Sequence, residues 1–171
     1  MGKGLPRSSA RGAAARQDVI RQTITVSNLA LLVDGATGVG WNSVVAGDLP
    51  EGNILLLGAV SYLQFTAGGT ISTTFDGDYS IGTTATADAT LASGDIDIIP
   101  STPLGAATAS VSPRVRGVMT ASVCGTTYDN TDGSLELNLN LLIDDANISA
   151  DNEPVTANGV IHLAYIVLGD D

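Results

Sequence analysis

Apolar and polar residues alternate most clearly along residues 134–144. Leucines occupy one parity of this segment and polar residues the other: Leu135, Leu137, Leu139 and Leu141 against Glu136, Asn138 and Asn140. Successive side chains of a β-strand point to opposite faces of its sheet, so the pattern predicts a strand. We expect its leucine face to meet the core and its polar face to meet water or a partner protein.

The remainder of the chain from Gln22 onward shows the same texture in shorter runs. Gly, Asp, Asn or Pro interrupts the β-branched and apolar residues every 8 to 15 positions or so, which predicts many short antiparallel strands. The further expected strands are residues 23–32, 40–45, 53–66, 70–75, 95–99, 115–123 and 159–168. Without a helical layer to cover a parallel sheet, these strands predict one all-β domain over residues 22–171, either a jelly roll or an antiparallel β-sandwich.

Residues 1–21 have a different composition from this body. The first 18 residues combine Gly, Ser, Ala and Arg with almost no large apolar side chain. Burial therefore cannot offset the entropy lost when this segment becomes ordered on its own. We expect residues 1–21 to form an extended N-terminal arm that is flexible in the isolated chain.

The charges of the chain are divided between the arm and the body. The formal net charge is -11, of which the arm contributes +4, so residues 22–171 carry -15. Arg114 and Arg116 are the only Lys or Arg residues of the body, and Asp18 is the only acid of the arm. The arm's cations are Lys3, Arg7, Arg11, Arg16 and Arg21. This segregation indicates that the arm and the body bind different partners.

Targeting and membrane signals do not account for the arm. It has no apolar run of the kind a secretory signal needs, no apolar helical stripe typical of a mitochondrial presequence, and Pro6 at a position where myristoylation needs Ser or Thr. The longest apolar runs, residues 54–57 and 161–168, are shorter than the roughly 18 residues of a membrane-spanning helix. We expect no membrane partner.

The inventory of reactive side chains is small. The chain has one His, one Cys and one Lys, whereas catalysis needs a nucleophile, base or metal in a prepared site. We interpret His162 as a packed or hydrogen-bonded residue of a strand and Cys124 as a small buried apolar residue. We therefore expect no enzymatic activity and no cofactor.

Acidic clusters raise the question of calcium. Asp76-Gly77-Asp78 and residues 129–133 place short carboxylates beside Gly, but both lack the downstream Glu of an EF-hand loop, and turn chemistry explains them. Asp144 and Asp145, with Asp151 and Glu153, are expected to form a solvated acidic loop. We predict no metal site, and a calcium titration followed by thermal unfolding would test the calcium alternative.

Nucleotide and nucleic-acid binding are disfavoured. The Gly-rich segment 35–40 precedes no predicted helix, so it is expected to be a loop between two strands. A body with a charge of -15 repels phosphates, so nucleic acid is not expected as a partner outside the arm.

Several stretches resemble virion structural proteins of tailed bacteriophages, including capsid cement (decoration) proteins. They are VDGATGVGWNSVVAGDLPEGNILLLGAVSY, FDGDYSIGTTATADATLASGDIDIIPSTPLGAATA, YDNTDGSLELNLNLLIDDANISADN and the closing IVLGDD. The resemblance implies a jelly-roll or sandwich body, homo-oligomers that are often trimers at local symmetry axes, and a location on the outer surface of the capsid. It also implies terminal arms that grip the major capsid protein, a role that Lys3, Arg7, Arg11, Arg16 and Arg21 fit.

Two other functions remain open: another virion structural protein, of the tail, neck or a head fibre, and a carbohydrate-binding module. A tail or neck protein would place the basic arm near DNA, and its DNA affinity would fall steeply with salt. A carbohydrate-binding module would use a jelly roll to bind glycans, but Trp41 is the only tryptophan for a stacking platform. A lytic enzyme, which needs paired carboxylates in a cleft, is the least supported class.

Overall fold

The structure, a computed structural model, describes residues 18–36, 38–71, 73–148 and 152–168. Nearly every regular element in these ranges is a β-strand. The elements are β1 (Ile20–Ala36), β2 (Val39–Asp48), β3 (Gly52–Ala67), β4 (Asp76–Gly82), the 3-10 turn η1 (Ser93–Asp95), β5 (Ile99–Pro103), β6 (Val115–Val118), β7 (Thr127–Asn130), β8 (Glu136–Asp144) and β9 (Glu153–Val167). The all-β prediction is confirmed.

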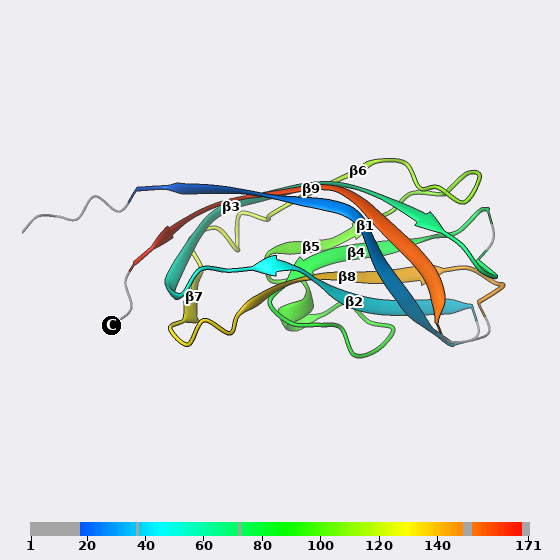
Figure 1. The fold of residues 1–171 in the computed structure, drawn as a ribbon, viewed down its shortest axis with the longest axis horizontal. Helices are drawn as coiled ribbons and strands as arrows, with labels where there is room; N and C mark the ends of the chain where they lie inside the picture. Colours follow the sequence, from blue (N-terminus) through cyan, green and yellow to red (C-terminus); the bar gives the residue numbers. More distant parts are fainter. Residues whose placement is uncertain (1–17, 37, 72, 149–151, 169–171) are drawn as a thin grey trace, which may run out of the picture.

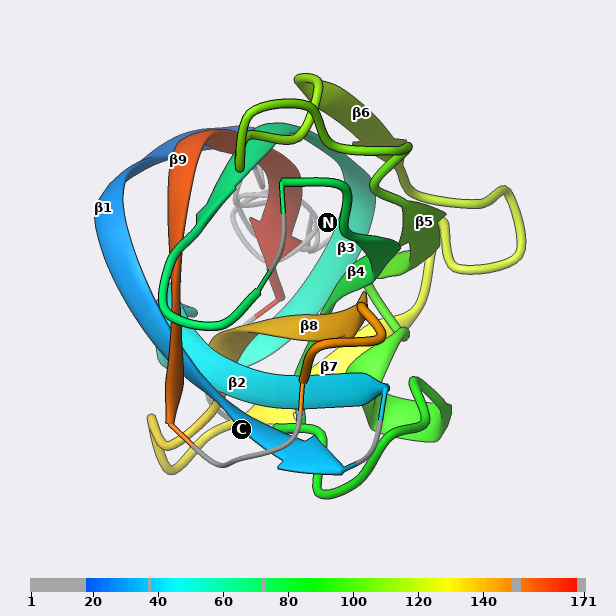
Figure 2. The same ribbon diagram turned by 90° about the vertical axis from the view of Figure 1, so that its right-hand side faces the viewer.

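The strands form two layers that wrap around one core (Figures 1 and 2). One layer has the order β1-β9-β3-β6, with β7 also pairing with β3, and the other has the order β2-β8-β4-β5. The layers join where β1 bends so that Asp34 to Ala36 pair with β2. All pairings are antiparallel, and the order within each layer is that of a jelly roll, as predicted.

Large side chains from both layers fill the space between them. Phe65 of β3 and Tyr79 of β4 are fully buried and lie with ring centroids 5.5 Å apart at 46°. The hydroxyls of Tyr79 and Ser61 lie 2.9 Å apart in a buried hydrogen bond, which satisfies both polar groups. Burial raises the pKa of Tyr79, so the phenol stays neutral and works as a core residue.

Two bulges change which residues of the long strands face the core. In β3, Ile54 and Leu56 are buried on one parity, whereas Ala59 and the buried residues that follow lie on the other. The register with β9 shifts between Leu56 and Gly58, where one extra residue enters β3. A second shift lies between Val26 and Leu29 of β1. Each bulge turns extra positions toward the outside.

Several strand predictions hold and others need correction. Residues 23–32, 40–45, 53–66, 134–144 and 159–168 all fall mainly in strands. The predicted strand 70–75 is wrong, because its described residues, 70, 71 and 73–75, belong to a loop before β4. Residues 95–99 mostly precede β5, which contains Pro100 and Pro103 and lies at the edge of its layer, where proline is tolerated. In 115–123 only Val115–Val118 form a strand.

The polar face of β8 is exposed at Glu136, as predicted, but it is buried at Asn138 and Asn140, contrary to the prediction. Asn140 is fully buried, donates to the carbonyls of Thr84 and Asp95 at 3.0 Å each, and accepts from the amide of Thr86 at 2.9 Å. The segment 83–97 therefore covers β8 from outside. Asp97 closes this segment by accepting two hydrogen bonds from Thr83. The alternation of apolar and polar residues along β8 is as predicted, but the sequence did not predict that residues 83–97 cover its polar face.

Candidate functional site

The predicted arm lies almost entirely outside the described residues. Lys3, Arg7, Arg11 and Arg16 are not among them. Arg21 is described: it lies in β1 opposite Ala164 of β9 and is exposed. Because β1 begins at Ile20, the last two residues of the range 1–21 belong to the sheet of the body.

Arg21 shares one outer face with Arg116, one of the two arginines of the body. Residues paired directly across antiparallel strands point to the same side of a sheet. Three adjacent rows of paired residues run across the layer: Arg21, Ala164 and Gly58; Thr23, His162, Val60 and Val118; and Thr25, Val160, Tyr62 and Arg116. We call these residues the β3–β9 face. They include no Asp or Glu, although the body is strongly acidic.

The centre of the β3–β9 face is apolar and partly exposed. Tyr62 is 37% exposed and Val118 is 43% exposed, while Val60, Val160 and Ala164 are half-buried. These side chains are neighbours on three strands, β3, β6 and β9, so their exposed surface is continuous. A contiguous apolar patch that polar residues surround is typical of a site for protein association.

A groove of about 440 Å³ crosses this face at the β3 bulge. Gly58 and Ala164 leave space in the groove because they have little or no side chain. Arg21, Thr23 and Val60 also line it. His162 also lines the groove, and its Nδ1 lies 2.9 Å from the Thr23 hydroxyl in a hydrogen bond. The prediction of a packed or hydrogen-bonded histidine is confirmed.

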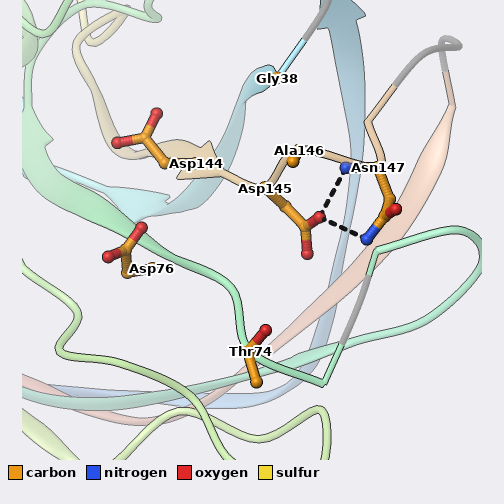
Figure 3. A pocket seen from close by; sticks show the side chains of 7 residues that line it. All are labelled: Gly38, Thr74, Asp76, Asp144, Asp145, Ala146 and Asn147. Atoms are coloured by element: carbon orange, nitrogen blue, oxygen red, sulfur yellow. Dashed lines mark hydrogen bonds between the residues drawn. The ribbon is translucent and has the colours of Figure 1, made fainter.

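A second hollow, of about 560 Å³, is acidic (Figure 3). Asp76, Asp144 and Asp145 line it together with Thr74 and Asn147. Burial, followed by the charges of Asp76 and Asp78, raises the pKa of Asp144. The buried Asp145 instead accepts hydrogen bonds from the backbone amide and side-chain amide of Asn147 at 2.8 and 3.1 Å, and Figure 3 shows its carboxylate turned toward Asn147.

The acidic segments are more ordered than the sequence suggested. Asp76 to Asp78 lie in β4 and not in a turn, because they pair with β8. Glycine is needed at position 77, where φ is +133° and an added Cβ would collide with the carbonyl of Leu142. The predicted solvated loop is also wrong for Glu153, which is buried and accepts from the Thr70 amide at 2.7 Å and hydroxyl at 2.6 Å. Asp151 lies outside the described residues.

Residues 131–133 form the predicted turn, whereas Asp129 and Asn130 are the last residues of β7. Asp129 accepts from the amide and hydroxyl of Thr131 at 3.1 and 2.8 Å, and Asp132 does the same for Ser134 at 3.1 and 2.7 Å. These hydrogen bonds lower the pKa of both carboxyls. Within the described ranges, no group of three or more His, Cys, Asp or Glu side chains is placed to hold a metal ion.

The raised pKa of Asp144, caused by burial and then by the neighbouring charges, gives a prediction for pH dependence. Since folding raises the pKa of Asp144 above its usual 3.8, any stabilisation from its protonated form is complete below that pH and is lost as the pH rises through the raised value. The amide of an asparagine imitates the protonated carboxyl. We expect Asp144→Asn to raise the melting temperature at pH 7, and only by about 1 to 2 °C, because Asp144 is only slightly buried and solvent screens its charge.

The gain should vanish near pH 3 and shrink in high salt, as differential scanning fluorimetry can measure. Asp132→Asn is the matched control with the opposite sign, because it removes a carboxylate whose pKa is lowered by the hydrogen bonds from Ser134. A gain for Asp144→Asn that is the same at pH 3 and pH 7 would contradict this account of the acidic hollow.

The prediction that Cys124 is a buried apolar residue is wrong. Its side chain is exposed, not buried, since the chain leaves the sheet after Val118 and residues 119–126 form a loop. Its Sγ lies 3.3 Å from the carbonyl of Leu57, to which it donates. Sequence composition gave no sign of this, because Thr, Ser and Val around Cys124 also suit a strand.

Sequence reasoning missed the β3–β9 face as a unit. The parity of Arg116 and Val118 and the scarcity of cations after residue 22 were visible signals. The bulge at Gly58 and the pairing of β3 with β6 and β9 were not visible in the sequence, because they join residues that are far apart in the chain.

In the described part of the chain, no helix is long and apolar enough to cross a membrane.

Comparisons with known proteins give only distant likenesses. No family model matches the chain, and no curated protein matches it. A chain of the Gx strain of infectious bursal disease virus and one of the VP2 subviral particle of the same virus both have a TM-score of 0.37 and 11% identity, covering 90% and 85% of this chain. This chain spans 34% and 32% of their lengths.

A chain of desmodium yellow mottle tymovirus has a TM-score of 0.34 and 12% identity, with coverage of 89% of this chain and 90% of the viral one. Similarity this low carries no functional conclusion. We therefore base the assignment of function on the residues of the chain itself.

Proposed function

We propose that the chain is a non-enzymatic cement protein of a tailed bacteriophage. It binds the assembled lattice of the major capsid protein on the outer surface of the head and stabilises the shell. The observation that carries the proposal is the separation of a +4 segment, residues 1–21, from a -15 body. The sequence resemblance to phage virion proteins agrees with it. The jelly-roll fold is compatible with a cement function but does not distinguish it from other functions, because capsid and lectin domains share this fold.

The separation of charge suits a fastener. A ligand that binds only the assembled lattice stabilises that lattice by mass action. The basic arm, with Lys3, Arg7, Arg11 and Arg16 as its anchors and Arg21 at its junction with β1, binds acidic grooves of neighbouring capsid subunits. The folded body, linked to the arm through β1, adds a rigid part that remains on the shell surface.

Affinity cannot come from the arm charges alone. Exposed ion pairs contribute about 0.2 to 1 kcal/mol each, so five cations supply only a few kcal/mol. A homotrimer overcomes this limit, because binding of one arm raises the effective concentration of the others to about millimolar. We propose a homotrimer as the working unit, and native mass spectrometry of the purified chain measures its order directly.

A reconstitution experiment tests the function. Purified chain is added to expanded capsids that lack it, and bound chain is measured after sedimentation, together with the temperature at which the capsids break open. We expect saturable binding at a fixed ratio to capsid subunits and a higher disruption temperature. Absence of binding at low and moderate salt would refute the cement function, and binding to tails or DNA in place of capsids would support the tail or neck alternative.

A further inference from the structure

We propose that the β3–β9 face is the docking surface of the body, and that its occupant is an acidic protein surface with an apolar centre. The inference rests on the proposed function, because it takes the assembled capsid as that partner. The capsid then has two contacts with the chain, one through the arm and one through the β3–β9 face. The β3–β9 face is the part of the folded domain that faces the shell.

Charge is the first support for this choice of partner. The body as a whole carries -15 and repels acidic surfaces. The β3–β9 face is an exception, since its rows contain Arg21 and Arg116 at opposite margins and no carboxylate. An acidic partner is therefore attracted to this side of the domain and repelled from the others. Electrostatic complementarity of this kind fixes the orientation of docking.

The apolar centre supplies the contact area between these arginines. Tyr62 and Val118 are exposed to 37% and 43%, and Val60, Val160 and Ala164 extend the same surface across β3 and β9. Interfaces are often built in this way, with an apolar and aromatic centre and a polar rim. Tyr62, which lies beside Arg116 in the register, is the residue we expect to contribute most.

The groove specifies a feature of the partner. Its floor is open at Gly58 and Ala164, and Arg21 and Thr23 stand at its border. A protruding Asp or Glu side chain fits this arrangement, because the arginine fork binds a carboxylate through two hydrogen bonds. His162 is already engaged by the Thr23 hydroxyl, so Arg21 is the cation available to that carboxylate.

Other occupants fit the face less well. A second copy packed through the same face about a two-fold axis would bring positive margins together without any carboxylate of the face to neutralise them. Residues 1–17 of the chain itself are basic and carry few large apolar groups, so they complement neither the charge nor the apolar centre. Tyr62 is the one aromatic residue of the face, and this scarcity together with the charge of the body disfavours nucleic acid.

The point where the arm joins β1 agrees with a shared partner. Arg21 lies on the face and β1 begins one residue earlier, at Ile20. Residues 1–17 are therefore attached at the margin of the β3–β9 face. An arm and a face that start from the same margin can engage one capsid surface together, and binding of either raises the effective concentration of the other.

Filling the groove is the sharpest test. An added Cβ at Gly58 would meet only the Cβ of Ala164, at an ordinary 3.9 Å, so Gly58→Val should fold. Valine also suits a strand better than glycine does. We expect Gly58→Val to keep or raise the melting temperature and to weaken binding to expanded capsids by about tenfold. Unchanged affinity in this variant would overturn the proposed groove contact.

Matched pairs of variants test the apolar centre and the charges. Val118→Ser should weaken capsid binding, whereas Val45→Ser, at a valine of similar exposure (40%) on the other layer, should not. Arg21→Gln with Arg116→Gln should also weaken binding. Ala87→Asp with Thr90→Asp, at exposed positions of the covering segment, produces the same change of -2 in net charge and should have a much smaller effect.

The outcomes separate this inference from the proposed function. If the unaltered chain binds capsids and all the face variants bind equally well, the docking surface is wrong and the cement function stands. If the unaltered chain does not bind capsids, the cement function fails and the capsid is not the partner. If the face variants change the mass of the free protein by native mass spectrometry, the face joins copies of the chain and this proposal is overturned.

Discussion

Deletion of residues 2–17 is expected to reduce binding to expanded capsids below detection while the body remains folded. The deletion removes Lys3, Arg7, Arg11 and Arg16 but spares β1, whose first paired residue, Ile20, lies opposite Tyr165. Four exposed ion pairs contribute about 1 to 4 kcal/mol per chain. In a trimer the loss applies to three arms at once, so their mutual reinforcement disappears as well. Sedimentation with capsids measures the binding, and circular dichroism measures the fold.

The end point of the deletion matters for this test. A deletion that continued to residue 21 would remove Ile20 and Arg21 from the sheet and would mix loss of binding with loss of stability. A full-length variant with Gln at the four arm cations is the control, because it keeps the length of the arm and removes only its charge. Full capsid occupancy by the deleted chain would contradict the role of the arm.

Asn140→Leu is expected to destabilise the domain by about 3 to 5 kcal/mol. The replacement has a similar size, but it leaves the carbonyl of Thr84 and the amide of Thr86 without the hydrogen bond that Asn140 makes to each. It also removes one of two hydrogen bonds to the Asp95 carbonyl, which keeps the one from the Ser80 hydroxyl at 2.7 Å. Each unsatisfied buried group costs about 1 to 3 kcal/mol. Since domains of this size are stable by only about 5 to 15 kcal/mol, chemical denaturation should show a large shift of the midpoint.

Asn138→Leu is the matched control for this prediction. Asn138 lies on the same strand and the same face, but its side chain makes one long hydrogen bond, 3.4 Å, to the carbonyl of Thr83. We expect a loss of about 1 kcal/mol or less. Equal losses for the two variants would mean that the covering segment 83–97 is not held by Asn140.

The sequence was sufficient to predict the strands with a strong period of two. The leucines of β8 and the apolar runs of β1, β3 and β9 alternate over many residues, and Leu137, Leu139 and Leu141 lie in the core as predicted. The bulges escaped prediction because a bulge adds one residue without a change in composition. As a result, the outward positions of β3 before and after Gly58 belong to different parities.

The remaining errors have a common cause in contacts between distant segments. Asp76-Gly77-Asp78 has the composition of a turn, but pairing with β8 makes it a strand. Glu153 looked solvated, but Thr70, 83 residues away, provides its hydrogen bonds. The β3–β9 face depends on four strands from both ends of the chain. Local patterns identify such residues but not their neighbours.

The long antiparallel pairing of β1 with β9 has a mechanical consequence. Their register extends from Ile20 opposite Tyr165 to Val33 opposite Glu153, and the hydrogen bonds between antiparallel strands run perpendicular to the strand direction. A tension applied through Asp18 along the axis of β1 therefore loads these bonds in shear, many at the same time, and does not peel them open one by one. The first strand of the domain can transmit a pulling force into the jelly roll without unravelling at its tip.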